Sequence, residues 1–209
     1  FLDDAPLEER RTQAVLNRRW SDPQSSDDLG ALDAEAIVAV GEEAWPQPQN
    51  IDEMHEALMS LSCIGGAEAG TRPEWMKWLE TLARSGRATR LQVSADQALW
   101  IAIERLTCLR AIYPQAEMHP PLEALQDFDE AWDRDEAIVE VVRARLSGFG
   151  PMPGAEIAEP LSLSASSIAQ ALAKLESEGY VLRGQFTPGA SADQWCERHL
   201  LARIHRYTV

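Results

Sequence analysis

The sequence predicts a mainly α-helical protein of the α+β class, with two winged helices behind a helical N-terminal leader. The first observation is the stretch from 137 to 186, where apolar spacing and capping residues predict three helices followed by a strand. The second is that the order helix, helix, strand, strand also begins near residue 50, although the two copies share little identity. These patterns predict a helical leader over 1–45, a first winged helix over 46–114, an acidic, proline-containing linker over 115–133 and a second winged helix over 134–209.

The prediction of the second winged helix rests on its apolar spacing and its helix-ending residues. Its first helix stops at Gly148 and carries four apolar residues on one face, namely Ile138, Val141, Val142 and Leu146. A short helix with Ile157 follows, and a third helix begins at the cap Ser164 and ends at Gly179. The segment 180–186 supplies a strand and the start of a wing. This order is typical of scaffolds that hold nucleic acid, although a fold alone does not establish a function.

The first winged helix opens at Asn50, which forms a capping-box pattern with Glu53. We expect that helix to end at Gly65 and Gly66, and a longer helix to cover 73–85. Strands over 88–93 and 98–103 and a helix over 104–113 complete the copy.

The leader is expected to hold two helices. One covers 6–20, and a second runs from the cap Asp33 to about Trp45. The run PQPQN at 46–50 then breaks the chain, which indicates a domain boundary.

The formal net charge of −15 is distributed unevenly. Residues 1–50 hold 11 acidic and 4 basic side chains, and residues 113–136 hold 8 and 1. Residues 51–112 hold 8 and 7, and residues 137–209 hold 7 and 7. Both winged helices are therefore close to neutral, so the charge neither supports strong electrostatic DNA binding nor excludes a local basic surface.

Cysteine usage and hydropathy favour a cytoplasmic protein without a membrane partner. The three cysteines are widely spaced and odd in number, which argues against a disulfide framework. The sequence shows no signal peptide and no apolar run of membrane-spanning length. Because Phe1 is not a natural start, we expect this chain to be a piece of a longer protein.

The segment 194–209 is interpreted as one amphipathic helix and gives the sharpest binding signal. Leu200, Leu201 and Ile204 fall on one side, and the opposite side is basic, with Arg198, His199, Arg203 and Arg206. Guanidinium groups on an exposed face suit contact with phosphates. The alternative is an interdomain helix whose arginines pair with acidic neighbours.

Each winged helix offers further candidate contacts. The first is more basic, and its phosphate-binding candidates are Lys77, Arg84, Arg87 and Arg90. The third helix of the second copy exposes Gln170 and Lys174 beside Ser166 and Ser177, which could meet phosphates or bases. Most of the seven tryptophans fit a core, but Trp45 or Trp132 could offer a stacking face to an unpaired base.

No complete active site is predicted. The pairs Asp129-Glu130 and Asp135-Glu136 have the letters of a helicase magnesium site but lack the buried strand and the Gly-rich phosphate loop that such a site needs. Cys196 and His199 would share a helical face, but no further ligand lies at metal spacing. We therefore expect the chain itself to hold no cofactor, to hydrolyse no ATP and to cleave no glycosidic bond.

Three segments resemble the large helicase-related (Lhr) family of bacterial superfamily 2 proteins: Phe1–Arg11, Leu146–Pro151 and, most specifically, Gln194–Arg206. The resemblance spans nearly the whole chain. It implies an ATP-dependent 3′-to-5′ translocase on single-stranded DNA that unwinds duplexes, including RNA:DNA hybrids, and serves DNA repair. This chain would lie beyond the motor domains, which would bind ATP and Mg²⁺ and would be its partners together with DNA.

Two other functions stay open. The far C-terminal part of long Lhr proteins resembles winged-helix DNA glycosylases, in which a Gln-x-Gln pair supports base excision. Gln47 and Gln49 match those letters, but they lie in the proline-rich boundary segment. Near-neutral winged helices also serve as protein-interaction modules.

Overall fold

The structure is a computed structural model that describes residues 32–208. It is mainly helical with two small sheets, so the predicted fold class is confirmed. The helix expected over 6–20 and Trp20 lie outside the described residues. Within 32–208, no helix combines the length and the apolar character that crossing a membrane requires.

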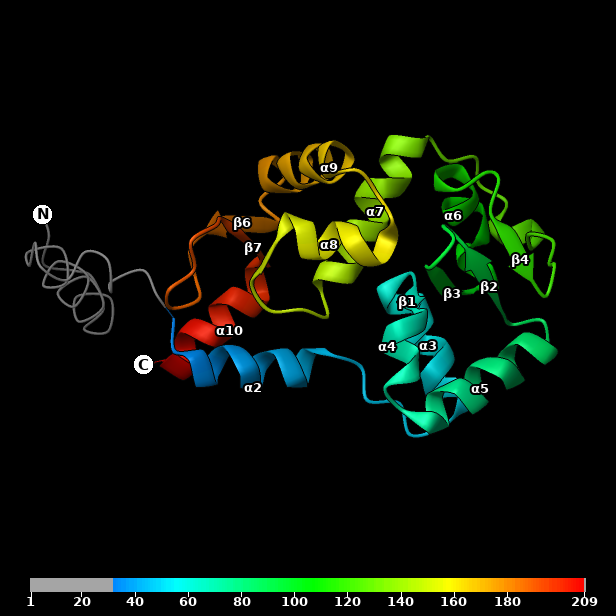
Figure 1. The fold of residues 1–209 in the computed structure, drawn as a ribbon, viewed down its shortest axis with the longest axis horizontal. Coiled ribbons are helices and arrows are strands. Elements are labelled where there is room, and N and C mark those ends of the chain that lie inside the picture. Colours follow the sequence, from blue (N-terminus) through cyan, green and yellow to red (C-terminus); the bar gives the residue numbers. More distant parts are fainter. Residues whose placement is uncertain (1–31, 209) are drawn as a thin grey trace, which may run out of the picture.

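The first unit, Ile51–Ala102, places three helices against an antiparallel sheet (Figure 1). In chain order it contains α3 (Ile51–Leu61), β1 (Ile64–Gly65), α4 (Gly66–Gly70), α5 (Pro73–Arg84), β2 (Ala88–Gln92) and β3 (Ala98–Ala102). The connector that follows holds the turn η1 (Ile103–Arg105), α6 (Leu106–Ile112), β4 (Glu117–His119) and η2 (Gln126–Phe128). Strand β4 joins the sheet, whose order is β1-β3-β2-β4.

The second unit, Arg134–Glu197, repeats this order. It contains α7 (Arg134–Leu146), β5 (Met152–Pro153), α8 (Gly154–Leu161), α9 (Ala165–Ser177), β6 (Val181–Gly184) and β7 (Gln194–Glu197). Its antiparallel sheet has the order β5-β7-β6, which corresponds to β1-β3-β2 of the first unit. Both units are therefore compatible with the predicted winged helices.

Side-chain caps explain why α2, α3 and α9 begin where the sequence predicts. The side chain of Asn50 accepts hydrogen bonds from the amides of Asp52 and Glu53. Asp33 caps α2 (Ala34–Ala44), and Ser164 accepts a bond from the amide of Ser167 at the start of α9.

Two predicted boundaries are wrong. Helix α3 ends at Leu61, because Ser62 turns to a positive φ of 62° and Ile64–Gly65 pairs with β3. The segment 194–209 is not one helix: Gln194–Glu197 forms β7, which pairs with both β5 and β6, and α10 runs over Arg198–Thr208. Cys196 and His199 therefore share no helical face.

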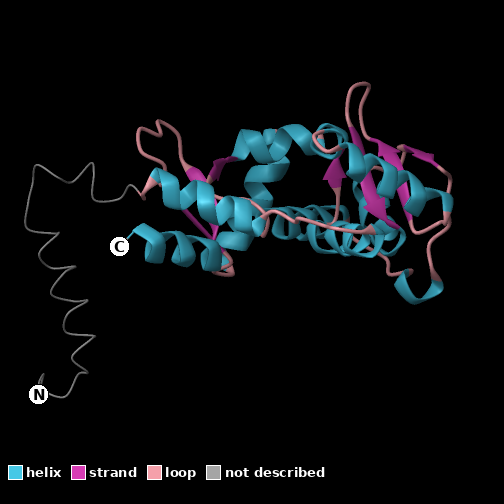
Figure 2. Cartoon of the chain, turned by 90° about the horizontal axis from the view of Figure 1, so that it is seen from below, coloured by secondary structure: helices cyan, strands magenta, loops and turns pink. Residues whose placement is uncertain are grey.

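A continuous apolar core joins the two units. One cluster of buried side chains includes Leu91 and Leu99 of the first sheet, Leu106 of α6, Val142 of α7 and Leu172 of α9. Other side chains of the first unit form a second cluster around Trp75 of α5. The molecule is elongated, with a sheet toward each end (Figure 2).

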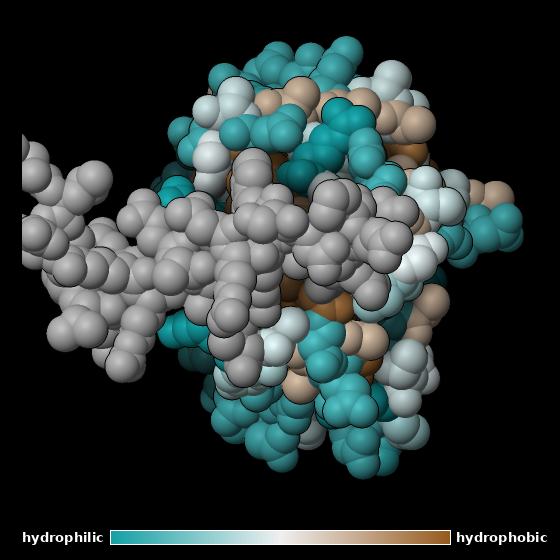
Figure 3. All heavy atoms as spheres, turned by 90° about the vertical axis from the view of Figure 1, so that its left-hand side faces the viewer, coloured by the Kyte–Doolittle hydropathy of each residue, from teal (hydrophilic) through white to brown (hydrophobic). Residues whose placement is uncertain are grey.

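Helix α2 comes before the first unit in sequence but packs beside α10, after the second unit (Figure 1). Val40 of α2 and Leu200 and Ile204 of α10 are buried in the core between them. The described surface at this end of the molecule is mostly hydrophilic (Figure 3).

Candidate nucleic-acid interface

An open cavity of about 680 Å³ lies where α2 and the two units meet, and we call it the central cavity. Its lining comes from three segments that are distant in sequence, the first of which includes α2 and the residues directly after it. These are Ile37, Val38, Gly41 and Glu42 of α2, Trp45 and Gln47 after it, Arg72 before α5, and Gly150, Pro151, Met152 and Glu156 around the start of α8. Its volume lies within the usual range for ligand sites.

Trp45 provides a fixed aromatic wall of the central cavity. Its ring centroid lies 4.8 Å from that of Phe149, with the planes tilted by 47°. It also stacks on Trp75 at 6.2 Å, with the planes only 19° apart. The side chain is half-buried, so part of it still borders the cavity. This geometry is compatible with the prediction that Trp45 stacks on an unpaired base, whereas Trp132 packs against the core that the two units share.

The boundary segment places Gln47 on the central cavity. The Gln47 side-chain amide donates a hydrogen bond to the backbone oxygen of Glu42 at 3.0 Å. The Gln49 side-chain amide donates to the backbone oxygen of Gln47 at 2.9 Å, and the Gln49 backbone amide donates to Glu53 at 2.8 Å. The position of these residues in a proline-rich segment therefore does not exclude a role in a site, because that segment forms part of the cavity wall.

The charged groups around the central cavity have different signs. Arg72 is exposed, its guanidinium lies 5.5 Å from the centroid of the Trp75 ring, and it forms no ion pair with any residue in 32–208. The carboxylates of Glu42 and Glu156 belong to the same lining. A cation at the rim suits a phosphate, and carboxylates suit the N–H groups of a base.

The predicted arginines of α10 have different environments. The apolar face of α10 is buried as predicted, with Leu200 and Ile204 against α2. Arg203 pairs with Glu43 of α2, which matches the alternative of arginines paired within the protein. Arg198 and Arg206 are exposed and form no ion pair inside the described range, so phosphate contact by these two stays a prediction.

The basic side chains of the first unit do not gather around the central cavity. Arg87 pairs with Asp52 at 2.7 Å, and the exposed Arg84 lies 3.9 Å from Glu80. Lys77 and Arg90 are exposed on α5 and β2. These residues remain candidates for contact with the DNA backbone away from the cavity.

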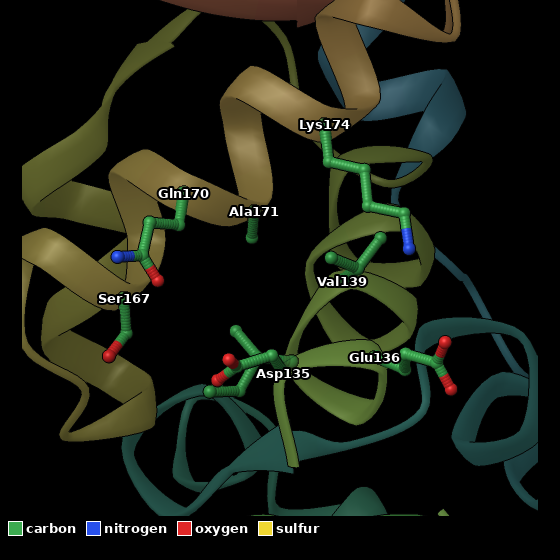
Figure 4. A pocket seen from close by; sticks show the side chains of 8 residues that line it. Asp135, Glu136, Val139, Ser167, Gln170, Ala171 and Lys174 are labelled. Atoms are coloured by element: carbon green, nitrogen blue, oxygen red, sulfur yellow. The ribbon is translucent and has the colours of Figure 1, made fainter. Parts of the chain in front are cut away.

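Gln170 and Lys174 of α9 line a smaller cavity of about 200 Å³ between α9 and α7 (Figure 4). Asp135 and Glu136 line the α7 side of it. These carboxylates disfavour the approach of a phosphate to Lys174 by like-charge repulsion. Contact of Gln170 and Lys174 with nucleic acid stays a prediction.

The cysteines fit a structural role. Burial raises the pKa of Cys63 to about 11 and that of Cys108 and Cys196 to about 12, so each thiol stays protonated near neutral pH. Across residues 32–208, no three His, Cys, Asp or Glu side chains lie together as a metal site would require.

Comparison with known proteins places the chain in a DNA-acting family. A relative from Mycolicibacterium smegmatis, described as Lhr helicase/probable uracil glycosylase, is 22% identical over 220 residues. The alignment covers this whole chain but only 14% of the relative, so the chain spans a small part of that protein's length. The family model described as DNA glycosylase AlkZ-like matches residues 2–202. Because this match covers nearly the whole chain, the chain belongs to the AlkZ-like DNA glycosylase family.

Proposed function

We propose that this chain is the DNA-engaging region of an Lhr-like DNA-repair helicase, and that it holds an unpaired DNA base against Trp45 in the central cavity. The observation that carries the proposal is the convergence of Trp45, Gln47 and Arg72 on one open cavity. The DNA glycosylase family supports DNA as the partner of this chain. The printed name of the relative supports the inference that the longer protein is a helicase.

The cavity offers a separate group for each part of a nucleotide. A base stacks on the Trp45 ring, which needs no particular sequence because every base has an aromatic face. The Gln47 amide can exchange its internal bond for one to the edge of the base. Arg72 at the rim can meet the phosphate. Strand guidance of this kind would act on single-stranded DNA or an RNA:DNA hybrid, while the motor domains supply ATP hydrolysis with Mg²⁺.

Fluorescence anisotropy with a labelled single-stranded oligonucleotide tests this proposal. Trp45→Leu should lower the affinity about tenfold, since stacking of one base contributes roughly 1–3 kcal/mol. Trp132→Leu is the matched control, because Trp132 is also half-buried but lies outside the cavity lining, and it should leave the affinity unchanged. Equal affinities of both variants and the unchanged chain would contradict the proposal, and an absence of DNA binding would favour a protein-interaction module.

Base excision is a second candidate function, favoured by the position of Gln47 beside two carboxylates in the central cavity. In that reaction the bond from C1′ to the base nitrogen breaks and its electron pair leaves with the base. Water adds to C1′ and gives up a proton, which Glu42 or Glu156 is placed to accept.

An incision assay distinguishes the two candidates. The purified chain is incubated with oligonucleotides that contain uracil or an alkylated base, and alkali then cleaves any abasic site. Abasic product that disappears in Gln47→Ala supports excision. A lack of product, together with DNA binding that depends on Trp45, supports strand guidance alone.

A further inference from the structure

Arg145 on α7 links the two units from inside the protein. The residue is only 5% exposed. Its Nη1 donates to the backbone oxygen of Cys63 at 3.1 Å and to Oε2 of Glu68 at 2.9 Å, and its Nη2 donates to the other carboxylate oxygen of Glu68. Cys63 and Glu68 belong to the first unit and Arg145 to the second, so one side chain fixes the two units relative to each other.

Glu68 is held in place from its own side of the contact. Its Oε2 also accepts a hydrogen bond from the backbone amide of Gly65 at 2.7 Å. The carboxylate thus meets a planar guanidinium with both oxygens, a geometry that a lysine ammonium does not reproduce.

The same guanidinium lies next to the aromatic wall of the central cavity. Its central carbon is 4.8 Å from the centroid of the Phe149 ring and 5.9 Å from that of Trp45. Arg145 and Glu68 line a neighbouring cavity of about 270 Å³, which shares Met152 and Glu156 with the central cavity. The ion pair that links the two units and the aromatic wall of the cavity are therefore in direct contact through Arg145.

We propose that Arg145 is a positioning residue: through Glu68 and Phe149 it fixes the Trp45 ring at the orientation in which a base can stack on it. The inference rests on the proposed function, because it is the stacking of a base that gives this orientation a role. Arg145 is outside the lining of the central cavity and acts on the DNA through Trp45.

The first test follows the environment of the Trp45 ring in the absence of DNA. The chain is labelled with 5-fluorotryptophan, and the ¹⁹F resonance of Trp45 is assigned by its loss in Trp45→Phe. Arg145→Lys keeps the charge but loses the two-oxygen contact, so the Trp45 resonance should shift or broaden. Arg143→Lys is the matched control, because Arg143 lies on the same helix and pairs with Glu178 inside the second unit, over the Tyr180 ring. An unchanged Trp45 resonance in Arg145→Lys overturns the inference.

The second test measures affinity for a single-stranded oligonucleotide in the same variants. Arg145→Lys should weaken binding about tenfold, by the loss of one base-stacking contact, whereas Arg143→Lys should not. A shifted resonance with unchanged affinity supports the positioning by Arg145 but contradicts the proposed role of the cavity, so the two failures are distinguishable.

A double variant keeps the test decisive if Arg145→Lys unfolds. Replacing a buried ion pair by apolar residues of similar volume is often tolerated, so Glu68→Met with Arg145→Met should remain folded. Its Trp45 resonance should still differ from that of the unchanged chain. An identical resonance in this folded variant counts against the inference.

Discussion

Arg203 on α10 forms an ion pair with Glu43 on α2, and this pair joins helices from opposite ends of the described chain. Both side chains are partly exposed, and the two helices also share a buried apolar cluster that contains Val40 and Ile204. Arg203 thus helps to hold α2 in place against α10, and α2 forms one wall of the central cavity. Its guanidinium is therefore not part of a free basic surface.

Reversing the charge at Arg203 should therefore affect stability more than DNA binding. We expect Arg203→Glu to lower the free energy of unfolding by about 1 kcal/mol, because an exposed ion pair contributes little and a like-charge pair replaces it. Urea denaturation measures this change. The double variant Arg203→Glu with Glu43→Arg should recover most of the loss, and a failure to recover it would show that the pair is not the cause.

Arg198 and Arg206 should show the opposite behaviour. Both are exposed, so Arg198→Glu with Arg206→Glu should leave the melting temperature nearly unchanged. If both side chains contact phosphates, the negative slope of log K against log salt should become shallower by about 1.4, since each contact with a single strand contributes roughly −0.7. A salt titration of binding checks this, and an unchanged slope would remove α10 from the DNA interface.

Gly148 should not tolerate a side chain. A Cβ at this position would lie 2.8 Å from Cδ2 of Leu61 and 3.5 Å from the Trp45 ring. Gly148→Ala should destabilise the protein by about 1–3 kcal/mol through overpacking. Gly41 is the control, because a Cβ there meets nothing within 4 Å and the residue lies inside α2, so Gly41→Ala should stabilise by roughly 0.5–1 kcal/mol. Thermal and urea denaturation compare the two, and equal effects would contradict the packing at Gly148.

The buried cysteines predict a loss of stability at high pH. Burial raises the pKa of Cys63, Cys108 and Cys196 from 9.0 to between about 11 and about 12, so the unfolded chain releases these protons first as the pH rises. The unfolded state then binds fewer protons than the folded state, and the free energy of unfolding falls. The slope is about 1.4 kcal/mol per pH unit for each thiol between the two pKa values.

Urea denaturation at several values between pH 8 and 11 measures this slope. Below about pH 10, Cys108→Ala should flatten it by about one third, because one of the three thiols is removed. Above that pH, Tyr113 and Tyr180 also contribute to the slope, because burial raises the pKa of both phenols. A free energy of unfolding that stays constant over this range in the unchanged chain would contradict the burial of the thiols.

Features that depend on neighbouring residues were predictable from the sequence. The caps Asn50, Asp33 and Ser164 were identified because a capping side chain bonds to amides two or three residues away. Strands β1 and β5 were missed, because two residues show no alternation of apolar and polar side chains. Strand β7 was predicted as part of the C-terminal helix, because the apolar spacing of α10 extends back across Cys196.

The sequence did not predict that the residues of the central cavity come together in one site. Trp45 and Gln47 were named as candidates, but their meeting with Arg72 and Glu156 depends on long-range packing of the two units. Arg145 gave no signal, because an arginine on a helix usually faces solvent and its partner Glu68 is 77 residues away.

The pairing of α2 with α10 has a mechanical consequence. The backbone amide of Asp33 donates to Oγ1 of Thr208 at 3.2 Å, so the two ends of the described chain lie side by side. A pulling force applied across these ends would load the α2–α10 contact before it reached the shared core of the two units. Since α2 also forms a wall of the central cavity, such tension would act on that wall before it acted on the core of either unit.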